Sequence, residues 1–586
     1  MKTFFKMLLA TVVGTMLSLV LIVFFFMIVG IAALSKDSVP VVASKSVLKL
    51  ELNCPIEERV QDNPFEKYSS AFSTGGMLGL NTLLDNIAKA KQDDNIVGIC
   101  LDISNVSAPL ATLSEIRNAL EDFKTSGKFV YCYAEVLSQS SYYLASVATK
   151  VYFNPRGMLE LRGLSAQTLF FKGLLDKMDI EMQIVKHGTF KSAVEPFILN
   201  KMSEANRLQV ETFVGSMWKS VLSDISKSRS IDVKTINDVC DSLTLFGNTA
   251  LAAELGFVDA LVYRDEFENL VRAQLKLDSA ATINWVSLKE YRKVPAVEKK
   301  SKDEIAVIYA VGNIVDGKST GTNQIGASTA EELAKARKNK DVKAIVFRVN
   351  SGGGSALTSD LIWREVVLAQ KEKPVVVSMG DCAASGGYYI SCAADYIVAQ
   401  PTTLTGSIGV FGAFPNMQKM LENKLGITAD RVNTNTYADV TSVTRPLSVY
   451  ERAQLQKMVD ETYTVFMQRV ADGRKLRTSF VDSIAQGRVW AGADALNLGL
   501  VDTLGGLDIA IVKAAQLAKI DKYSTVEYPK MKDFYQEFME AFLDTKISNR
   551  LQKSALSETY FYFQYLESAL ELKGVQARLP YVIVIE

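Results

Sequence analysis

One serine, Ser385, stands among small residues in the stretch DCAASGGYYIS, residues 381–391. Two alanines precede it, two glycines follow it, and the apolar run 374–379 lies just before the stretch. A hydroxyl at a strand-to-helix turn of small residues is typical of a nucleophile, because nothing bulky covers its oxygen. Ser385 is therefore the candidate nucleophile, and such a serine needs a base nearby.

A run of three glycines supplies a second chemical feature. The stretch NSGGGSA, residues 350–356, follows an apolar run that we expect to form a strand. Glycines after a strand let backbone N–H groups approach a ligand, and such donors stabilise the oxyanion of an acyl-transfer reaction. The candidate oxyanion-hole residues are Gly353, Gly354 and, directly after the serine, Gly386. The structural alternative is a tight strand-to-helix turn with no chemical role.

The usual base, histidine, is nearly absent from the chain. His187 is its one histidine, and the neighbours Lys186 and Gly188 are typical of a surface or structural residue. Lys191 lies close by in GTFKSAVEPF, residues 188–197, among small and apolar side chains. Burial there would lower the lysine pKa from about 10.4 toward neutrality, and a neutral lysine is a competent general base. Lys191 is therefore the candidate base.

The chain contains a long internal repeat. At an offset of 246 residues, YYLASVATKVYFNP (142–155) lies on YYISCAADYIVAQP (388–401) with four identities and no gap. Both halves alternate short apolar stretches with helical ones. The expected strands are 97–103 and 129–133 in the first half and 342–349 and 374–379 in the second. This alternation predicts βαβ units with right-handed crossovers, and hence an α/β fold of two tandem repeat domains.

The repeat also shows which half carries each chemical group. Ser385 falls on Gln139, so only the second half has the hydroxyl. Lys191 falls on Tyr437, or on Ala438 with one gap, so only the first half has the amine. This complementary loss predicts one composite site for each pair of domains. The alternative is that the two residues merely differ between repeats.

Hydropathy divides the rest of the chain. Residues 7–34 follow Lys2 and Lys6, hold no charged side chain, and exceed the roughly 20 residues that cross a bilayer. A cleaved signal peptide is the alternative for this run. The expected layout is a cytoplasmic N-terminus at 1–6, a transmembrane signal anchor at 7–34, α/β domains at 45–280 and 304–525, a linker at 281–303 and a helical tail at 526–586.

Charge and cysteine usage argue against other classes of function. Lysine plus arginine and aspartate plus glutamate both number 65, so nothing favours a nucleic-acid partner. Six scattered cysteines and one histidine give no spacing typical of a zinc site. We therefore expect neither a metal nor another cofactor.

Four spaced motifs resemble those of a known family. GTFKSAVEPF, RVNSGGGSA, GDCAASGGYY and LTGSIGVFG stand in the order found in the long bacterial form of the signal peptide peptidase A family. The resemblance covers about residues 1–525. One departure is Gly352, where the family usually has proline, and we expect this glycine to loosen the oxyanion loop.

The resemblance implies a Ser/Lys serine endopeptidase that degrades signal peptides released in the membrane, with Ser385 as nucleophile and Lys191 as general base. It implies a fold like that of crotonases and the caseinolytic protease, assembled as a homotetramer. The protein would be a single-pass protein of the bacterial inner membrane with its catalytic body on the periplasmic side. Apart from the family, Ser407 in the stretch TGSIG is a candidate for orienting the lysine ammonium, the alternative being a simple turn serine.

Two other functions stay open at this point. A crotonase-like acyl-CoA enzyme also uses glycine-rich backbone donors, but it needs carboxylates near them, and this loop has none. A membrane-tethered, non-catalytic scaffold would use the repeats and the tail only to assemble partners. The second half nevertheless keeps Ser385 and its three glycines, which favours a protease.

Overall fold

The computed structural model describes residues 40–60, 77–295, 301–319, 323–531, 575–578 and 584–585, and parts of residues 3–22. The predicted anchor at 7–34 lies partly outside these residues, and most of the predicted tail at 526–586 lies outside them too. Within the part of the chain that is described, no helix combines the length and the apolar character needed to cross a membrane.

The first half of the chain builds a parallel sheet. Its elements are β1 (Ser46–Leu50), α3 (Leu80–Gln92), β4 (Ile96–Asp102), α4 (Leu110–Lys124), β5 (Phe129–Leu137), α5 (Gln139–Ala145), β6 (Lys150–Leu159), β9 (Ala260–Leu261), α11 (Arg264–Gln274) and β10 (Trp285–Ser287). The strands pair in the order β10-β1-β4-β5-β6-β9. Successive residues of β4 enter opposite cores, because Leu101 packs with α4 residues and Cys100 with α11 residues. Burial on both faces explains why these strands are nearly continuous apolar runs.

The second half repeats this plan. Its elements are β11 (Glu304–Val311), α13 (Ala327–Lys338), β14 (Val342–Ser351), α14 (Ala356–Gln370), β16 (Val375–Ala384), α15 (Gly386–Ser391), β17 (Tyr396–Ala399), β18 (Leu404–Gly406), β20 (Val489–Ala491), β21 (Thr503–Leu504), α20 (Leu507–Ala518) and β22 (Ser524–Tyr528). The main path is β20-β18-β16-β14-β11-β22, with β17 attached to β16 and β21 attached to β17. Ile362 of α14 and Ala510 of α20 belong to different core clusters, as they would on opposite faces.

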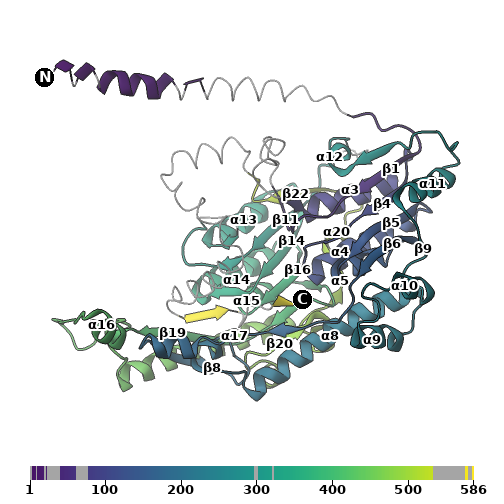
Figure 1. Cartoon of the computed structure of the whole chain (residues 1–586). Coiled ribbons are helices and arrows are strands. Elements are labelled where there is room, and N and C mark those ends of the chain that lie inside the picture. Colours follow the sequence, from purple (N-terminus) through teal and green to yellow (C-terminus); the bar gives the residue numbers. More distant parts are fainter. Residues whose placement is uncertain are drawn as a thin grey trace.

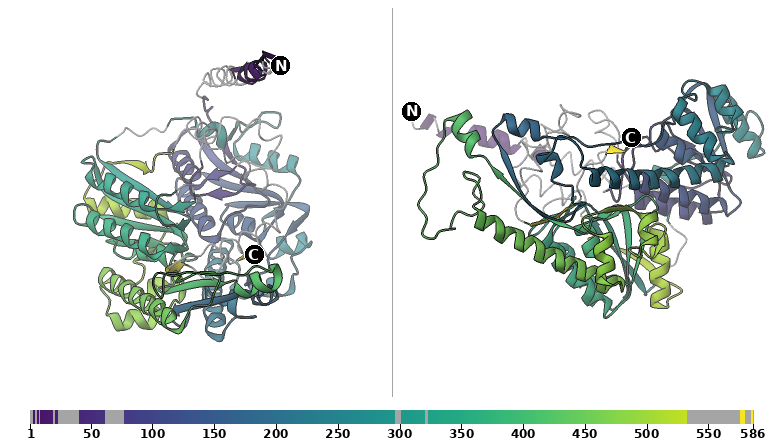
Figure 2. Two further views of the ribbon diagram at one scale, coloured as in Figure 1. Left: turned by 90° about the vertical axis from the view of Figure 1, so that its left-hand side faces the viewer. Right: turned by 90° about the horizontal axis from the view of Figure 1, so that it is seen from below.

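The two sheets correspond strand by strand. The order β10-β1-β4-β5-β6-β9 has its counterpart in β22-β11-β14-β16-β17-β21. Figure 1 shows the sheets beside each other, with α4 and α20 between them. Each half also contributes a 26-residue helix with a serine N-cap, α8 (Glu204–Arg229) and α17 (Val449–Arg474), which are conspicuous in Figure 2. The predicted α/β class with two parallel-sheet repeats is confirmed.

Two of the expected segments differ in the structure. Strand β10 lies inside the predicted linker 281–303, because Val47 and Leu48 of β1 pair with Trp285 and Val286. Most of the tail predicted to be helical, 526–586, lies outside the described residues, and those described include the end of β22 and two further strands, β23 (Val575–Arg578) and β24 (Val584–Ile585). In both cases a partner strand far away in the sequence determines the conformation.

A third sheet joins the halves. It runs in the order β13-β12-β15-β23-β19-β8, and its remaining members are β8 (Glu181–His187), β12 (Asn313–Ile314), β13 (Gln324–Ile325), β15 (Gly353–Ser355) and β19 (Val410–Asn416). Strand β8 of the first half pairs antiparallel with β19 of the second, from His187 opposite Val410 to Glu181 opposite Asn416. The two strands lie side by side near α17 in Figure 1. This pairing carries the chain of the first half onto the second repeat just before Lys191.

A buried ion cluster also connects the halves. Arg348 of β14 is fully buried, with Nε 2.9 Å from Glu58 Oε2 and Nη2 2.7 Å from Glu115 Oε1 of α4. Asp381 of β16 adds a third acid and accepts a hydrogen bond from Thr112 N at 2.9 Å. Burial raises the pKa of Glu115 to about 7, with Arg348 opposing and Glu58 adding to the rise. The guanidinium of the second repeat therefore compensates two carboxylates of the first, Glu58 and Glu115.

Replacement of this arginine should destabilise the chain in a pH-dependent way. Arg348→Met leaves Glu58 and Glu115 without their buried cation, and we expect a loss of roughly 3–5 kcal/mol at pH 8. The loss should be smaller at pH 5, because protonation neutralises Glu115 there. Urea unfolding at both pH values measures the difference. The control Arg337→Met, at a partly exposed ion pair, should cost less than about 1 kcal/mol, and equal losses for Arg348→Met at both pH values would contradict the assignment.

Candidate active site

Ser385 occupies a strained turn between β16 and α15. Its φ of 56° and ψ of −116° lie in a region that residues other than glycine rarely adopt. Its N–H donates to Gly406 O at 2.8 Å, and its carbonyl accepts from Tyr389 N at 2.8 Å as α15 begins. The side chain is fully buried. Backbone strain of this kind is typical of a turn that presents a nucleophile.

The lysine predicted as base reaches this serine within one chain. Lys191 lies in the loop after β8, and its Nζ donates to Ser385 Oγ at 2.8 Å. The same Nζ contacts Ser407 Oγ at 3.1 Å and Ser407 O at 3.3 Å. The structure thus brings together Ser385, Lys191 and Ser407, all of them fully buried.

The surroundings of Lys191 favour the neutral amine. The three oxygens that its Nζ contacts in Ser385 and Ser407 are all uncharged. Burial lowers the pKa of Lys191 well below the ordinary value of 10.5, because it removes the hydration of the ammonium. A buried ammonium loses its hydration, so the proton leaves more readily than it would in water. The amine can therefore accept a proton at a pH where an exposed lysine cannot.

Residues of the second half enclose the loop that carries Lys191. A Cβ added to Gly487 would lie 2.6 Å from Lys191 Cβ, and one added to Gly409 would lie 3.2 Å from Lys191 Cδ. Phe190 N donates to Gln486 O at 2.8 Å. Only glycine at 409 and 487 allows the two backbones to approach this closely. Gly409 stands in the motif LTGSIGVFG, where the sequence assigned it no role, and Gly487 stands in none of the motifs that the sequence singled out.

A buried glutamine ties the loop to helix α8 and strand β20. Gln209 Nε2 donates to Phe190 O at 3.1 Å and to Ser192 Oγ at 2.8 Å, while its Oε1 accepts from Val489 N at 3.1 Å. Sequence reasoning missed this residue. Nothing in the sequence signalled its role, because a glutamine has many possible hydrogen-bond partners.

Two of the three predicted oxyanion-hole glycines face one another. The Cβ position of Gly353 lies 2.6 Å from Gly386 N, and its φ is +94°. Gly353 N itself donates to Ser351 Oγ at 3.1 Å. Gly354 is oriented differently, because a Cβ there would collide with Ile314 O of β12. The geometry groups Gly353 and Gly386 with the serine and leaves Gly354 in the strand pairing.

The equivalent position in the first repeat is closed. Gln139, at the start of α5, donates from Nε2 to Gly163 O at 2.9 Å. Its Oε1 accepts from Arg162 N at 3.0 Å and from Gly163 N at 2.8 Å. The Gln139 side chain is therefore fully engaged in hydrogen bonds to the backbone of Arg162 and Gly163, and the first repeat has no hydroxyl at this point.

Two other features lie apart from the serine. His187 stacks on Tyr463 with ring centroids 4.0 Å apart, and its Nδ1 is 2.8 Å from Asp460 Oδ1.

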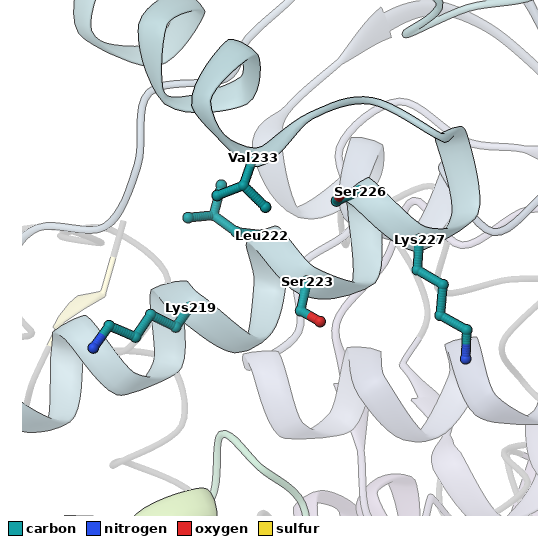
Figure 3. A pocket seen from close by; sticks show the side chains of 6 residues that line it. All are labelled: Lys219, Leu222, Ser223, Ser226, Lys227 and Val233. Carbon is teal, nitrogen blue, oxygen red and sulfur yellow. The ribbon is translucent and has the colours of Figure 1, made fainter.

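A pocket of about 310 Å³ lies on α8 and the start of α9 (Val233–Ser242), as Figure 3 shows. Its lining residues are Lys219, Leu222, Ser223, Ser226, Lys227 and Val233. None of the predicted site residues is among them. Within the described residues, no cluster of metal-binding side chains occurs.

The buried lysine should make the free energy of unfolding depend on pH. Because the folded-state pKa of Lys191 is lowered, the unfolded chain binds one proton more between that pKa and about 10.5, so this term makes stability rise with pH. Lys191→Met removes the term. Between pH 7 and 10, we expect the parent to gain stability relative to the variant by up to about 1.4 kcal/mol per pH unit.

Thermal unfolding of both proteins across this range measures the effect. Lys457→Met serves as control, because that side chain is 68% exposed, and its melting curve should follow the parent at every pH. Parallel curves for the parent and Lys191→Met would show that Lys191 is not held neutral in the folded chain.

Comparison with known proteins places this geometry in a family. The model of peptidase family S49 matches residues 122–278 and 368–521, one region in each repeat and together more than half of the chain. "Protease 4" of Salmonella typhi is 40% identical over 463 residues, covering 78% of this chain and 73% of the relative. "Protease 4" of Haemophilus influenzae is 38% identical over 484 residues, covering 81% and 77%. The Arabidopsis thaliana "Serine protease SPPA, chloroplastic" is 33% identical over 490 residues, covering 81% and 69%. With a serine within reach of a buried amine and relatives of this similarity, the chain belongs to peptidase family S49 and is a serine protease.

Proposed function

We propose that Ser385 is the nucleophile of this protease and Lys191 its general base. The observation that carries the proposal is the 2.8 Å contact between Lys191 Nζ and Ser385 Oγ in a buried, uncharged setting. A serine hydroxyl is a weak nucleophile until an adjacent base takes its proton, and a desolvated lysine is neutral enough to do so.

The reaction uses few groups. Lys191 takes the proton of Ser385 as Oγ attacks the carbonyl carbon of a peptide bond. The N–H of Gly386 holds the developing oxyanion, joined by the N–H of Gly353 when it turns away from Ser351 Oγ. The Lys191 ammonium, held by the oxygens of Ser407, then protonates the departing amine. Water cleaves the acyl-enzyme by the same steps in reverse.

The substrate and the cellular setting extend the proposal. We propose that the protease degrades apolar peptides such as signal peptides released in the membrane. The uncharged run 7–34 would be its anchor in the bacterial inner membrane, with the catalytic body on the periplasmic side and the chains assembled as a homotetramer. An enzyme held beside the bilayer would meet apolar peptides as they leave it.

Cleavage of a fluorogenic apolar peptide by the purified full chain tests the two catalytic assignments. Ser385→Ala and Lys191→Ala should each lower kcat/KM by at least about a thousandfold, because either change removes the nucleophile or its activation. His187→Ala should retain activity, since its imidazole contacts Asp460 and Tyr463.

A mixture of the two inactive variants tests whether one chain completes the site. The Lys191 and Ser385 side chains meet within one chain in the structure, so mixing Ser385→Ala with Lys191→Ala should restore no activity. Activity in either single variant, or recovery on mixing, would refute the assignment.

The pH dependence of kcat/KM tests the role of Ser407. Activity should rise with pH as Lys191 loses its proton, with a midpoint well below 10.5. Ser407→Ala removes an acceptor that stabilises the ammonium, so the midpoint should move to lower pH and the plateau should fall about tenfold. Ser483→Ala, an exposed serine that donates to a backbone carbonyl, is the matched control. A midpoint that stays in place would show that Ser407 does not hold the amine.

A further inference from the structure

Strand β16 contains a bulge just before the turn that carries the candidate nucleophile. Its pairing with β14 places Val349 opposite Met379, but the next pair joins Ser351 to Ala383. Two steps along β14 therefore correspond to four along β16, so residues 380–382 bulge out of the ladder. A bulge redirects the strand that contains it, and bulges are frequent beside active sites.

The side chain of Asn350 occupies this bulge. Its Oδ1 accepts from Cys382 N at 3.1 Å, and its Nδ2 donates to Asp381 Oδ2 at 3.1 Å and to Glu58 Oε1 at 3.0 Å. A carboxylate only accepts and a backbone N–H only donates, so these partners allow one orientation of the amide. No side chain fits at Gly380, because a Cβ there would lie 2.6 Å from Glu58 Oε1. Asn350 thus satisfies the Cys382 N–H where the ladder between the strands is interrupted.

The first repeat contacts the bulge through Thr112 and Glu58. Asp381 accepts from Thr112 N at 2.9 Å and from Thr112 Oγ1 at 2.9 Å. Thr112 lies in the first turn of α4, whose N-cap, Pro109, makes no side-chain hydrogen bond. Because the first N–H groups of a helix need partners from outside it, Asp381 caps a helix of the other repeat. The shape of the bulge therefore depends on both halves of the chain.

Both strands that Asn350 joins lead directly to the candidate reacting groups. On β14, the next residue, Ser351, accepts through Oγ from Gly353 N at 3.1 Å and donates to Gly312 O at 2.6 Å. On β16, two alanines separate the bulge from Ser385. A misplacement of about 1 Å at reacting groups can lower a rate about a hundredfold. The bulge therefore lies where it can determine how far the serine is from the candidate oxyanion-hole N–H groups.

We propose that Asn350 and Asp381 are positioning residues, which fix the bulge of β16 and thereby the distance between the nucleophile and the oxyanion-hole N–H groups. The inference rests on the proposed function, in which Ser385 is the nucleophile. It adds that the first repeat acts on the site at two places, through the loop after β8 and through its contacts at the bulge. Asn350 and Asp381 act through the backbone and not on the substrate.

The rate of peptide cleavage per active site tests this role in the full chain. The fluorogenic apolar peptide is the substrate, and a fluorophosphonate counts the reactive serines. Asn350→Asp sets a carboxylate against two others and removes the donor, so kcat per titrated site should fall at least about thirtyfold, with KM within about twofold. Asn497→Asp, at an exposed asparagine, is the matched control and should equal the parent. A residue that only supported stability would lower the number of titrated sites and leave the rate per site unchanged.

A double variant tests whether the two side chains act together. Asp381→Asn alone turns its N–H group toward another donor and should lower kcat per site about tenfold. In combination with Asn350→Asp, the same N–H group gains a carboxylate as acceptor, so the double variant should exceed Asn350→Asp at least about tenfold in kcat per site. Thr112→Val removes only the hydroxyl of the first repeat and should lower kcat per site about threefold, which tests the role even if the other variants fail to fold.

The outcomes separate this inference from the catalytic assignment. Unchanged kcat per site in Asn350→Asp or in Thr112→Val, with the parent labelled on Ser385, would overturn the positioning role alone. A double variant no more active per site than Asn350→Asp would overturn it as well. A parent that the fluorophosphonate does not modify on Ser385 would overturn the proposed function, and this inference with it.

Discussion

The site depends on one buried amine that has no opposite charge beside it among the residues that the structure describes. An ammonium in such a place loses its hydration, so the fold must supply enough other contacts to keep Lys191 there. The pairing of β8 with β19 brings its loop onto the second repeat, the two glycines at 409 and 487 let the backbones approach, and Gln209 fixes the loop from α8. The same desolvation that disfavours the ammonium lowers the pKa of Lys191, and the proposed role as general base requires this lowered pKa.

Duplication explains why this arrangement needs both halves. Each repeat has a strand-to-helix turn at the same point of its sheet. In the first repeat Gln139 occupies this turn and bonds to the backbone of Gly163, whereas the second has Ser385 there with a strained backbone. The first repeat instead contributes the loop with Lys191. Buried Arg348 of the second half pairs with Glu58 and Glu115 of the first, so charge as well as apolar packing determines the relative position of the two sheets. The family assignment fits an active second repeat and excludes the acyl-CoA enzyme and the inert scaffold that the sequence had left open.

Local patterns in the sequence predicted much of this structure, and distant pairing accounts for most of the rest. The βαβ alternation follows from apolar runs of strand length, and Ser385 and Lys191 were recognisable because small residues surround them. Strand β10 within the expected linker and β23 within the expected helical tail were not predictable, since each takes its conformation from a partner hundreds of residues away. The same holds for Gly487 and Gln209, whose roles exist only once the Lys191 loop lies against them. The anchor expected at 7–34 falls partly outside the described residues.

The most direct measurement of the central claim is the reaction of the full chain with a fluorophosphonate, with the modified residue located by mass spectrometry. We predict one adduct per chain, on Ser385, formed at a rate that rises with pH around a midpoint well below 10.5 and falls at least a hundredfold in Lys191→Met. Modification of a different serine, or equal rates with and without the Lys191 amine, would contradict the assignment of Ser385 and Lys191.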